Sequence, residues 1–306
     1  MTQGSSIVGS TLVFGETVID LVRKSRRTNS PELATFSAYT GGTGANVAVA
    51  MTRLGAVAAL MSGVGADEWG ILLRTWLERE GVDLRWFVEP PGAVTPVSLI
   101  SLGPDKEPDI FMHCEALGHI ADQCAIFYEE ALDESRALYI ASNTLVGAAE
   151  RRLTLALRRR ALDRGLPVCI DINLRAGRWP SLSQAASLCR SIIHKATLVK
   201  CNRAEAEWIT GLADPSAAAA ALIALGADQV VVTLGSEGAL VVGAATTMIP
   251  SIRVRPRSTL GAGDALIATV MARLAISGWE TTALPDAVRE GVAAAGHVTE
   301  VWGAVN

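Results

Sequence analysis

Short apolar runs rich in β-branched residues alternate along the chain with longer segments in which apolar residues recur every three or four positions. The short runs are typical of buried parallel strands and the longer segments of amphipathic helices. We expect strands at residues 7–14, 58–65, 137–142, 167–173, 196–202 and 229–235. We expect helices at residues 69–79, 148–164, 183–195, 204–210, 217–225 and 265–276. The alternation predicts an α/β fold with a central, mostly parallel sheet flanked by helices.

Two segments interrupt this alternation, at about residues 16–40 and 86–120. The second contains the alternating patterns VSLISL and DIFMH, separated by turn residues, which predict strands of a small separate sheet. We therefore expect one α/β domain spanning residues 1–306, with a β-sheet lid formed by the two insertions. The apolar faces of residues 86–113 are more than a small sheet covers alone, which predicts a homodimer formed through the lid.

Composition and charge narrow the possible classes of function. Half of the 306 residues are hydrophobic, 19% are charged and the formal net charge is −4. These values exclude intrinsic disorder and give no electrostatic reason to expect a nucleic-acid partner. The five cysteines are widely spaced, and neither a signal peptide nor an apolar run of the ~20 residues that a membrane span needs is present. We expect a cytoplasmic protein with no membrane partner.

A glycine-rich turn before the helix expected at 265–276 is the strongest local signal. Residues 258–264 read STLGAGD. Glycines let the backbone come close to a ligand, and the N–H groups of a first helical turn are unpaired and carry a positive partial charge. The turn therefore predicts an anion site, beside which Asp264 would take a proton from an attacking hydroxyl. The alternative is that Asp264 only caps the helix.

A second glycine-rich segment, residues 41–50, reads GGTGANVAVA. Its glycines and Asn46 would let backbone and amide groups bind a polyol, although a tight turn with close helix packing explains the glycines equally well. Asp20 follows the first strand, at the edge where parallel sheets bind ligands. Val47 and Leu266 stand where the third glycine of a dinucleotide fingerprint belongs, which disfavours a nicotinamide enzyme.

Taken together and in order, the motifs resemble those of the ribokinase-like (PfkB) carbohydrate kinases, and they are most similar to the fructokinase and 2-keto-3-deoxygluconate kinase group. The matching stretches are the opening strand with its sugar-binding Asp (15–20), the first signature (41–55), the D-x-N-x-R-x-x-L-W stretch (171–179), the N-x-x-E motif (202–205), the nucleotide loop (233–238), the second signature (258–268) and the C-terminal segment beside adenine (294–304).

The resemblance implies a ribokinase-like fold and a set of residue roles. The implied roles are a general base at Asp264, an anion hole from the backbone of Gly261, Ala262 and Gly263, sugar contacts from Asp20, Gly41, Gly42, Asn46 and Arg175, ATP contacts from Asn202, Thr233, Gly235, Gly238 and Ala295, and a water-mediated Mg²⁺ shell at Asn202 and Glu205. The implied cofactors are ATP and Mg²⁺, with K⁺ as an optional activator. Phosphoryl transfer depends mainly on positioning and electrostatic stabilisation, which agrees with the glycine-rich turn.

The sequence departs from the family pattern at two places that bear on the chemistry. Ser258 and Leu260 replace an Asp and a Thr of the second signature, which weakens the expectation of K⁺ activation. Residues 112–115 (MHCE) stand where kinases of acidic sugars have a Tyr-Arg pair, so we expect a neutral sugar, with His113 and Glu115 contacting its hydroxyl groups. A basic run at residues 23–27 is interpreted as a solvated loop rather than a phosphate site.

The sequence therefore predicts an ATP-dependent kinase that phosphorylates a terminal hydroxyl of a small neutral monosaccharide, with fructose as the leading acceptor. The alternatives are a 2-keto-3-deoxygluconate kinase, a ribokinase or a nucleoside kinase. Outside enzymes, the alternative is a sugar or nucleotide sensor that has lost turnover. The intact run at residues 261–264 argues against a sensor, because a binding protein has no need of a base beside an anion hole.

Overall fold

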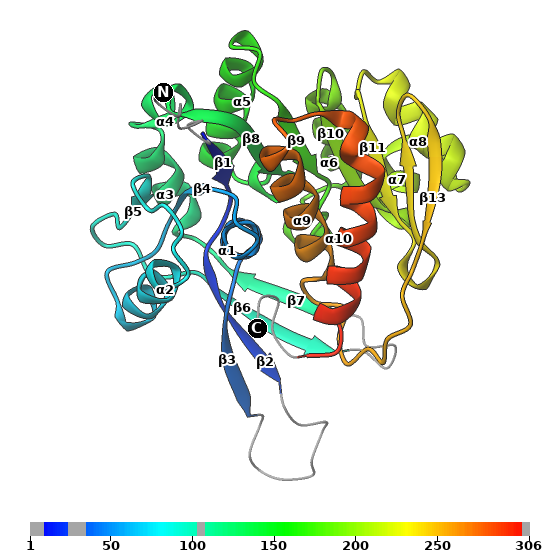
Figure 1. Cartoon of the computed structure of the whole chain (residues 1–306). Helices are drawn as coiled ribbons and strands as arrows, with labels where there is room; N and C mark the ends of the chain where they lie inside the picture. The colour runs from blue at the N-terminus through cyan, green and yellow to red at the C-terminus, as the bar shows by residue number, and fades with distance from the viewer. Residues whose placement is uncertain (1–8, 24–34, 103–107, 302–306) are drawn as a thin grey trace, which may run out of the picture.

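The structure is a computed structural model that describes residues 9–23, 35–102 and 108–301. Within these residues a nine-stranded sheet in the order β13-β12-β11-β10-β9-β8-β1-β4-β5 forms the centre of the molecule (Figure 1). Its strands are β1 (Ser10–Phe14), β4 (Ala58–Gly63), β5 (Phe87–Val88), β8 (Ser135–Ala141), β9 (Val168–Asp171), β10 (Leu198–Asn202), β11 (Val230–Thr233), β12 (Gly238–Val242) and β13 (Thr246–Pro250). Neighbouring strands pair parallel from β5 to β11, and β12 and β13 continue the sheet antiparallel. All the strands predicted from the apolar runs lie in this sheet, which confirms the predicted fold class.

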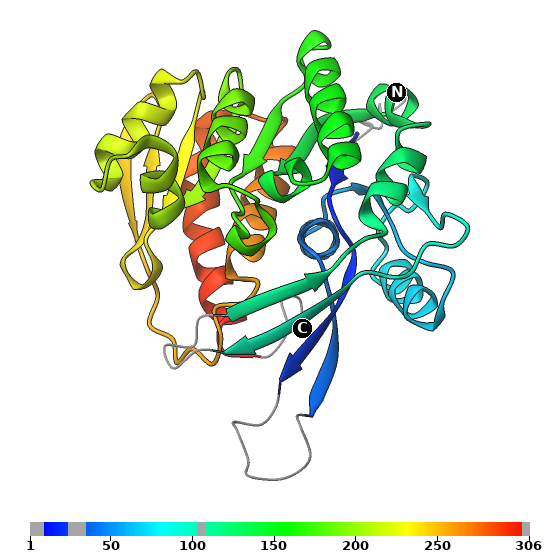
Figure 2. The same cartoon turned by 180° about the vertical axis from the view of Figure 1, so that it is seen from behind.

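Helices cover both faces of the large sheet. One face carries α1 (Thr43–Arg53), α2 (Glu68–Arg79), α9 (Ala262–Ile276) and α10 (Leu284–Val298) (Figure 1). The other carries α3 (Leu117–Cys124), α4 (Tyr128–Asp133), α5 (Ala148–Asp163), α6 (Leu182–Ile193), α7 (Arg203–Thr210) and α8 (Pro215–Ala224) (Figure 2). Short 3₁₀ turns lie at Ser142–Leu145, Ala176–Arg178, Gly235–Glu237 and Thr281–Ala283. Successive residues of β1 face opposite sides of the sheet, so that Leu12 packs in one core and Val13 in the other.

The lid is a separate four-stranded sheet in the order β3-β2-β6-β7 among the described residues. Its strands are β2 (Val18–Arg23), β3 (Phe36–Gly41), β6 (Val97–Leu102) and β7 (Pro108–His113). The two predicted insertions supply two strands each, as expected from their alternating patterns. Of the basic run at residues 23–27, only Arg23 lies within the described residues.

The second insertion is shorter than predicted. Its first part, β5, pairs with β4 in the large sheet, and its last residues begin α3. Leu117, Ile120, Ala121 and Cys124 recur at helical spacing and are buried in the core of the large domain. That helical period, rather than the strand period of residues 97–113, governs the chain from Leu117 onward.

The described helices include none with the length and apolar character needed to cross a membrane. All five cysteines are free thiols, and those other than Cys114 are buried. Burial raises the pKa of the Cys124 thiol to about 12. Such thiols pack as small apolar groups.

Candidate active site

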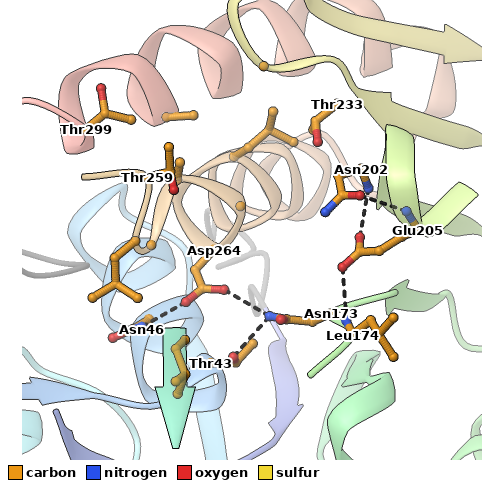
Figure 3. Close-up of a pocket in the computed structure, with 18 of the residues that line it drawn as sticks. Thr43, Asn46, Asn173, Leu174, Asn202, Glu205, Thr233, Thr259, Asp264 and Thr299 are labelled. Atoms are coloured by element: carbon orange, nitrogen blue, oxygen red, sulfur yellow. Dashed lines mark hydrogen bonds between the residues drawn. The ribbon is translucent and has the colours of Figure 1, made fainter. Parts of the chain in front are cut away.

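A cavity of about 1240 Å³ lies between the large sheet and the lid. Its walls come from the segments after β1, β9, β10 and β11, from the first turns of α1 and α9, from α10, and from the inner face of the lid (Figure 3). Parallel strands end at one edge of a sheet, which is why segments far apart in sequence meet here. All the predicted site residues line this cavity except Gly41, His113 and Glu115.

Asp264, in the first turn of α9, is held by amide side chains from two other elements. Asn46 Nδ2 on α1 donates a hydrogen bond to Asp264 Oδ2 at 2.8 Å, and Asn173 Nδ2, after β9, donates to Oδ1 at 3.5 Å. Asn173 also donates to Thr43 Oγ1 at 3.1 Å (Figure 3). The N-cap position of α9 belongs to Gly261, so capping is not what places Asp264 here.

Burial raises the pKa of Asp264 from 3.8 to about 6, and the hydrogen bond from Asn46 opposes the rise. The charge of Asp171 raises this pKa further, whereas the positive charges of Arg175 and Lys200 lower it. At pH 7 the carboxylate is ionised, yet it is a stronger base than an ordinary aspartate. A general base works best with a pKa near the working pH, so the environment of Asp264 suits proton abstraction.

The turn before Asp264 has the backbone form of an anion site. Gly261 has φ 80°, in the left-handed region that favours glycine, and α9 starts immediately after it. The Ala262 N–H donates to the Thr259 carbonyl at 3.2 Å, so this member of the predicted anion hole is engaged in the structure. Among the described residues, no backbone acceptor is found for the N–H groups of Gly261 and Gly263. These donors lie at the N-terminus of α9, where the helix dipole is positive, so an anion would be favoured there.

Asp20, on β2 of the lid, is the second buried carboxylate of the cavity. It lies opposite Ser98 of β6 in the parallel register, and the Ser98 side chain hydrogen-bonds to it. Burial raises the pKa of Asp20 to about 7, against the effect of Ser98; Asp264 raises it further and Arg175 lowers it. Gly41 leaves room for the Asp20 carboxyl group, because a Cβ at Gly41 would lie 2.1 Å from Asp20 Oδ2.

The glycines at the start of α1 have two different uses. Gly42 lines the cavity with φ 100°, and a Cβ there would lie 2.4 Å from the Glu16 carbonyl oxygen. Gly44 packs against Gly15, where a Cβ would lie 2.7 Å from the Gly15 carbonyl carbon. Close packing therefore explains Gly44, whereas Gly42 also leaves backbone open to a ligand.

Asn202 and Glu205 form a capping box at the start of α7. Glu205 N donates to Asn202 Oδ1 and Asn202 N donates to Glu205 Oε2, both at 2.8 Å. The other carboxylate oxygen, Oε1, accepts from Leu174 N at 3.0 Å. Burial raises the pKa of Glu205, and the neighbouring Lys200 ammonium opposes this. The motif thus fixes a carboxylate at the cavity wall while ending β10 and starting a helix (Figure 3).

This donor set fits a magnesium ion held mainly by water. No cluster of three or more His, Cys, Asp or Glu side chains arranged to chelate a metal occurs in the described ranges. Mg²⁺ usually keeps several waters and uses one or two carboxylates together with substrate phosphates. Both Asn202 and Glu205 line the cavity, and each carboxylate oxygen of Glu205 keeps acceptor capacity beyond its single backbone donor.

The predicted nucleotide loop lies across the cavity from α10. Thr233 ends β11, Gly235 has φ 60°, and both line the cavity together with Ala295 of α10. Gly238 also lines the cavity, but glycine is needed here for a structural reason as well. Its φ is 107°, and a Cβ at this position would lie 2.0 Å from the Ile249 carbonyl oxygen. Glycine at position 238 is required for β12 to pair with β13.

Apolar residues line the cavity beside this loop. They are Ile252 and Val254 of the segment after β13 and Val292, Ala295 and Gly296 of α10. A Cβ at Gly296 would lie 2.8 Å from the Ile252 side chain, so the glycine lets this segment pack closely against α10. A planar, largely apolar group such as a nucleobase suits an apolar lining of this kind.

His113 and Glu115 do not reach the cavity, which corrects the expectation that they contact the sugar. Side chains alternate along β7, and the cavity is lined by Ile110 and Met112. His113 is therefore on the opposite, exposed face, and Glu115 is exposed beyond the strand. Arg175 does line the cavity and is partly buried.

Some cavity residues carried no role in the sequence analysis. Ser98 had no distinguishing signal, because only the lid pairing brings it to Asp20. Glu16 accepts hydrogen bonds at its Oε1 from Asn143 Nδ2 at 2.5 Å and from Thr43 N at 3.3 Å, which ties the end of β1 to α1. Lys200 did carry a signal, since a lysine inside the apolar strand LVKCN is unusual for a buried position.

Comparisons with known proteins agree with the family resemblance seen in the sequence. The family model described as pfkB family carbohydrate kinase matches residues 9–306. Fructokinase-1 of Oryza sativa subsp. japonica is 29% identical over 265 residues, which cover 85% of this chain and 81% of that protein. Fructokinase-1 of Zea mays is 29% identical over 282 residues, which cover 90% of this chain and 84% of that protein.

Solved structures share the fold. The fructokinase from Vibrio cholerae O395 in its fructose, ADP and calcium bound form has a TM-score of 0.83 at 24% identity, covering 98% of this chain and 95% of that chain. The aminoimidazole riboside kinase from Salmonella enterica, complexed with aminoimidazole riboside and an ATP analog, has a TM-score of 0.83 at 24% identity, covering 97% and 95%. The ribokinase-like fold with its separate lid sheet is thereby confirmed. With the family model matched over nearly all of its length, the chain belongs to the pfkB family of carbohydrate kinases, phosphotransferases that use a sugar hydroxyl as acceptor.

Proposed function

We propose that the protein transfers the γ-phosphoryl group of ATP to a terminal hydroxyl of a neutral monosaccharide, with fructose as the preferred acceptor. The observation that carries this proposal is the placement of Asp264, a buried carboxylate fixed by two amides at the start of α9 and facing the same cavity as Asp20. The curated relatives from rice and maize, both named fructokinase-1, support fructose among neutral sugars.

In the proposed reaction Asp264 removes the proton of the attacking hydroxyl as the oxygen bonds to phosphorus and the bond to the ADP oxygen breaks. The lid carboxylate Asp20 and the amide of Asn46 hold other hydroxyls, so that the acceptor oxygen lies beside Asp264. The N–H groups of Gly261 and Gly263 and the α9 dipole stabilise charge on the phosphoryl oxygens. Mg²⁺, when bound, neutralises phosphate charge, and Asn202 and Glu205 would hold its water shell.

The lid's inner face favours a neutral acceptor. It lines the cavity with Val18, Asp20, Ser98, Ile100, Asp109, Ile110 and Met112, none of which is basic. A sugar carboxylate placed against this face would meet the carboxyl groups of Asp20 and Asp109 and no basic side chain among the lid residues that line the cavity. The basic residues that line the cavity lie outside the lid: Arg175 and Arg178 after β9, Lys200 and Arg203, which pair with Asp171 and Glu237, and Arg253 after β13.

The residues do not fit a monovalent-cation site of the kind that the resemblance implies. Ser258 is buried and contributes no carboxylate, and its Oγ accepts a hydrogen bond from Leu260 N at 3.1 Å. We therefore assign no step to K⁺ and expect turnover in its absence.

A substrate panel tests the proposal. Purified protein with Mg-ATP is assayed for ADP release with fructose, ribose, 2-keto-3-deoxygluconate and a nucleoside, and the phosphorylated product is identified by mass. We expect the highest kcat/KM with fructose. Highest efficiency with any other acceptor would replace the fructose assignment, and no sugar-dependent ADP release with any of them would overturn the proposed function.

A further inference from the structure

A buried ion pair lies under the glycine-rich turn, and its two charges have opposing effects on the pKa of Asp264. Lys200 on β10 and Asp171 on β9 face each other in the parallel register, and Lys200 Nζ lies 2.9 Å from Asp171 Oδ1. The side chains are 6% and 0% exposed. Buried ion pairs of this kind seldom add net stability over apolar packing, so their presence calls for another reason.

The position of the ammonium group gives that reason. A Cβ on Gly263 would lie 2.7 Å from Lys200 Nζ, so the ammonium is packed against the first turn of α9. Lys200 also lines the cavity, whereas Asp171 does not. A cation beside a helix N-terminus is electrostatically disfavoured, because the N-terminus already carries positive partial charge. An anion bound at the turn would attract both the Lys200 ammonium and the N-terminus of α9, and it would offset the repulsion between them.

The ammonium of Lys200 is held in place by its ion pair, because Nζ lies 2.9 Å from Asp171 Oδ1 and both side chains are buried. The ammonium is thus a fixed positive charge whose orientation is set by Asp171. A charge already in place requires no reorganisation as the reaction proceeds.

We propose that Lys200, anchored by Asp171, is a positioning residue for phosphoryl transfer, whose ammonium supports the 261–263 turn and adds positive potential where the phosphoryl group is held. This inference rests on the proposed function for the location of that group. Gly263 is part of it, because any larger residue would force the ammonium away from the turn.

The test uses Lys200→Met combined with Asp171→Asn, which removes both charges of the ion pair together. The matched control is Arg273→Met with Glu290→Gln, an ion pair of 2.6 Å at the far end of α9. With the best acceptor of the substrate panel, we expect kcat to fall about 10- to 100-fold in the test variant, with the sugar KM within about threefold. The control should match the wild type.

A second measurement does not depend on turnover. Binding of ADP with Mg²⁺ is measured by calorimetry with and without aluminium fluoride, an anion that imitates the transferred phosphoryl group. We expect aluminium fluoride to tighten ADP binding in the wild type and in the control, and the test variant to lose at least about tenfold of this effect while binding ADP alone normally. If the test variant does not fold, Asp171→Asn alone, which frees the ammonium from its anchor, should lose part of the effect.

The outcomes separate this inference from the proposed function. Tightening by aluminium fluoride that is unchanged in the variants, or absent from the wild type, would overturn the role of Lys200, and so would a wild-type kcat in the folded double variant. Tightening that depends on Lys200 in a protein without sugar-dependent turnover would support the inference and reject the sugar-kinase proposal.

Discussion

Asn46 donates a hydrogen bond of 2.8 Å to Asp264, although 218 residues separate them in the chain. The bond joins the first turn of α1 to the first turn of α9, and these two helices pack together on one face of the large sheet. Together with the longer bond from Asn173 to the other carboxylate oxygen, it fixes the orientation of the Asp264 carboxylate in the cavity. It also stabilises the ionised carboxylate against the cost of burial.

Replacing Asp264 with Asn should lower kcat by about two to four orders of magnitude, the range that a general base supplies. Sugar and ATP affinities should change much less, because the amide keeps the shape of the carboxylate. Steady-state kinetics with fructose and Mg-ATP measures both. Near-normal turnover by the folded variant would remove Asp264 from the mechanism.

The activity should depend on pH through the same carboxylate. Since the pKa of Asp264 is about 6, kcat should decline below pH about 6 as the base takes up a proton. In Asn46→Ala the hydrogen bond that lowers this pKa is lost, so the acidic limb should move to higher pH. A kcat profile between pH 5 and 9 shows both effects; an unmoved limb in Asn46→Ala would mean that another group controls it.

The sequence accounted for the fold better than for the contents of the cavity. Runs such as residues 229–235 predicted their strands because burial on both faces of a parallel sheet requires continuous apolar residues. The resemblance to the carbohydrate kinases placed Asp264, Asn46 and Glu205 at one site, and the structure brings all three to the cavity at the edge where the parallel strands end. Which face a lid side chain takes depends on register, and so His113, one residue from the inward-facing Met112, was misassigned.

Stability should fall as the pH rises from about 4 to about 8. The pKa of Asp264 is raised to about 6 and that of Asp20 to about 7, from 3.8. The folded protein therefore binds more protons than the unfolded chain in this range, and this stabilisation is full below pH about 4 and is lost as each carboxyl ionises in the fold. Between pH 4.5 and pH 8 the wild type should therefore lose stability relative to Asp264→Asn and to Asp20→Asn, on the order of 2–3 kcal/mol in each case.

Thermal unfolding at the two pH values measures this change in relative stability. A difference between each variant and the wild type that is the same at both pH values would contradict the linkage.

The lid should join two copies of the chain. Leu99 and Phe111 face each other across β6 and β7 on the surface away from the cavity, and they are 39% and 66% exposed. Phe36 on β3 is 44% exposed. An apolar face of this kind is covered by association in many soluble proteins. Light scattering at micromolar concentration should give a dimer mass, and Phe111→Asp should give a monomer with unchanged secondary structure; a monomeric wild type would reject the prediction.

The acceptor should be neutral, because the inner face of the lid has no basic residue and the two cavity arginines that follow β9 are both engaged in the described part of the chain. A carboxylate taken out of water needs a charge-assisted partner. Arg178 is already engaged, with its Nη2 at 4.0 Å from Glu150 Oε1 and its Nη1 donating to the Asn143 carbonyl at 3.4 Å. Arg175 already offsets the charges of Asp20 and Asp264, so a sugar carboxylate would compete with both for it. We expect kcat/KM for fructose to exceed that for 2-keto-3-deoxygluconate by at least about tenfold, equivalent to ~1.4 kcal/mol. Comparable efficiency on the acid would show that a cation reaches the acceptor after all, and loss of that acid activity in Arg175→Met but not in Arg178→Met would identify it.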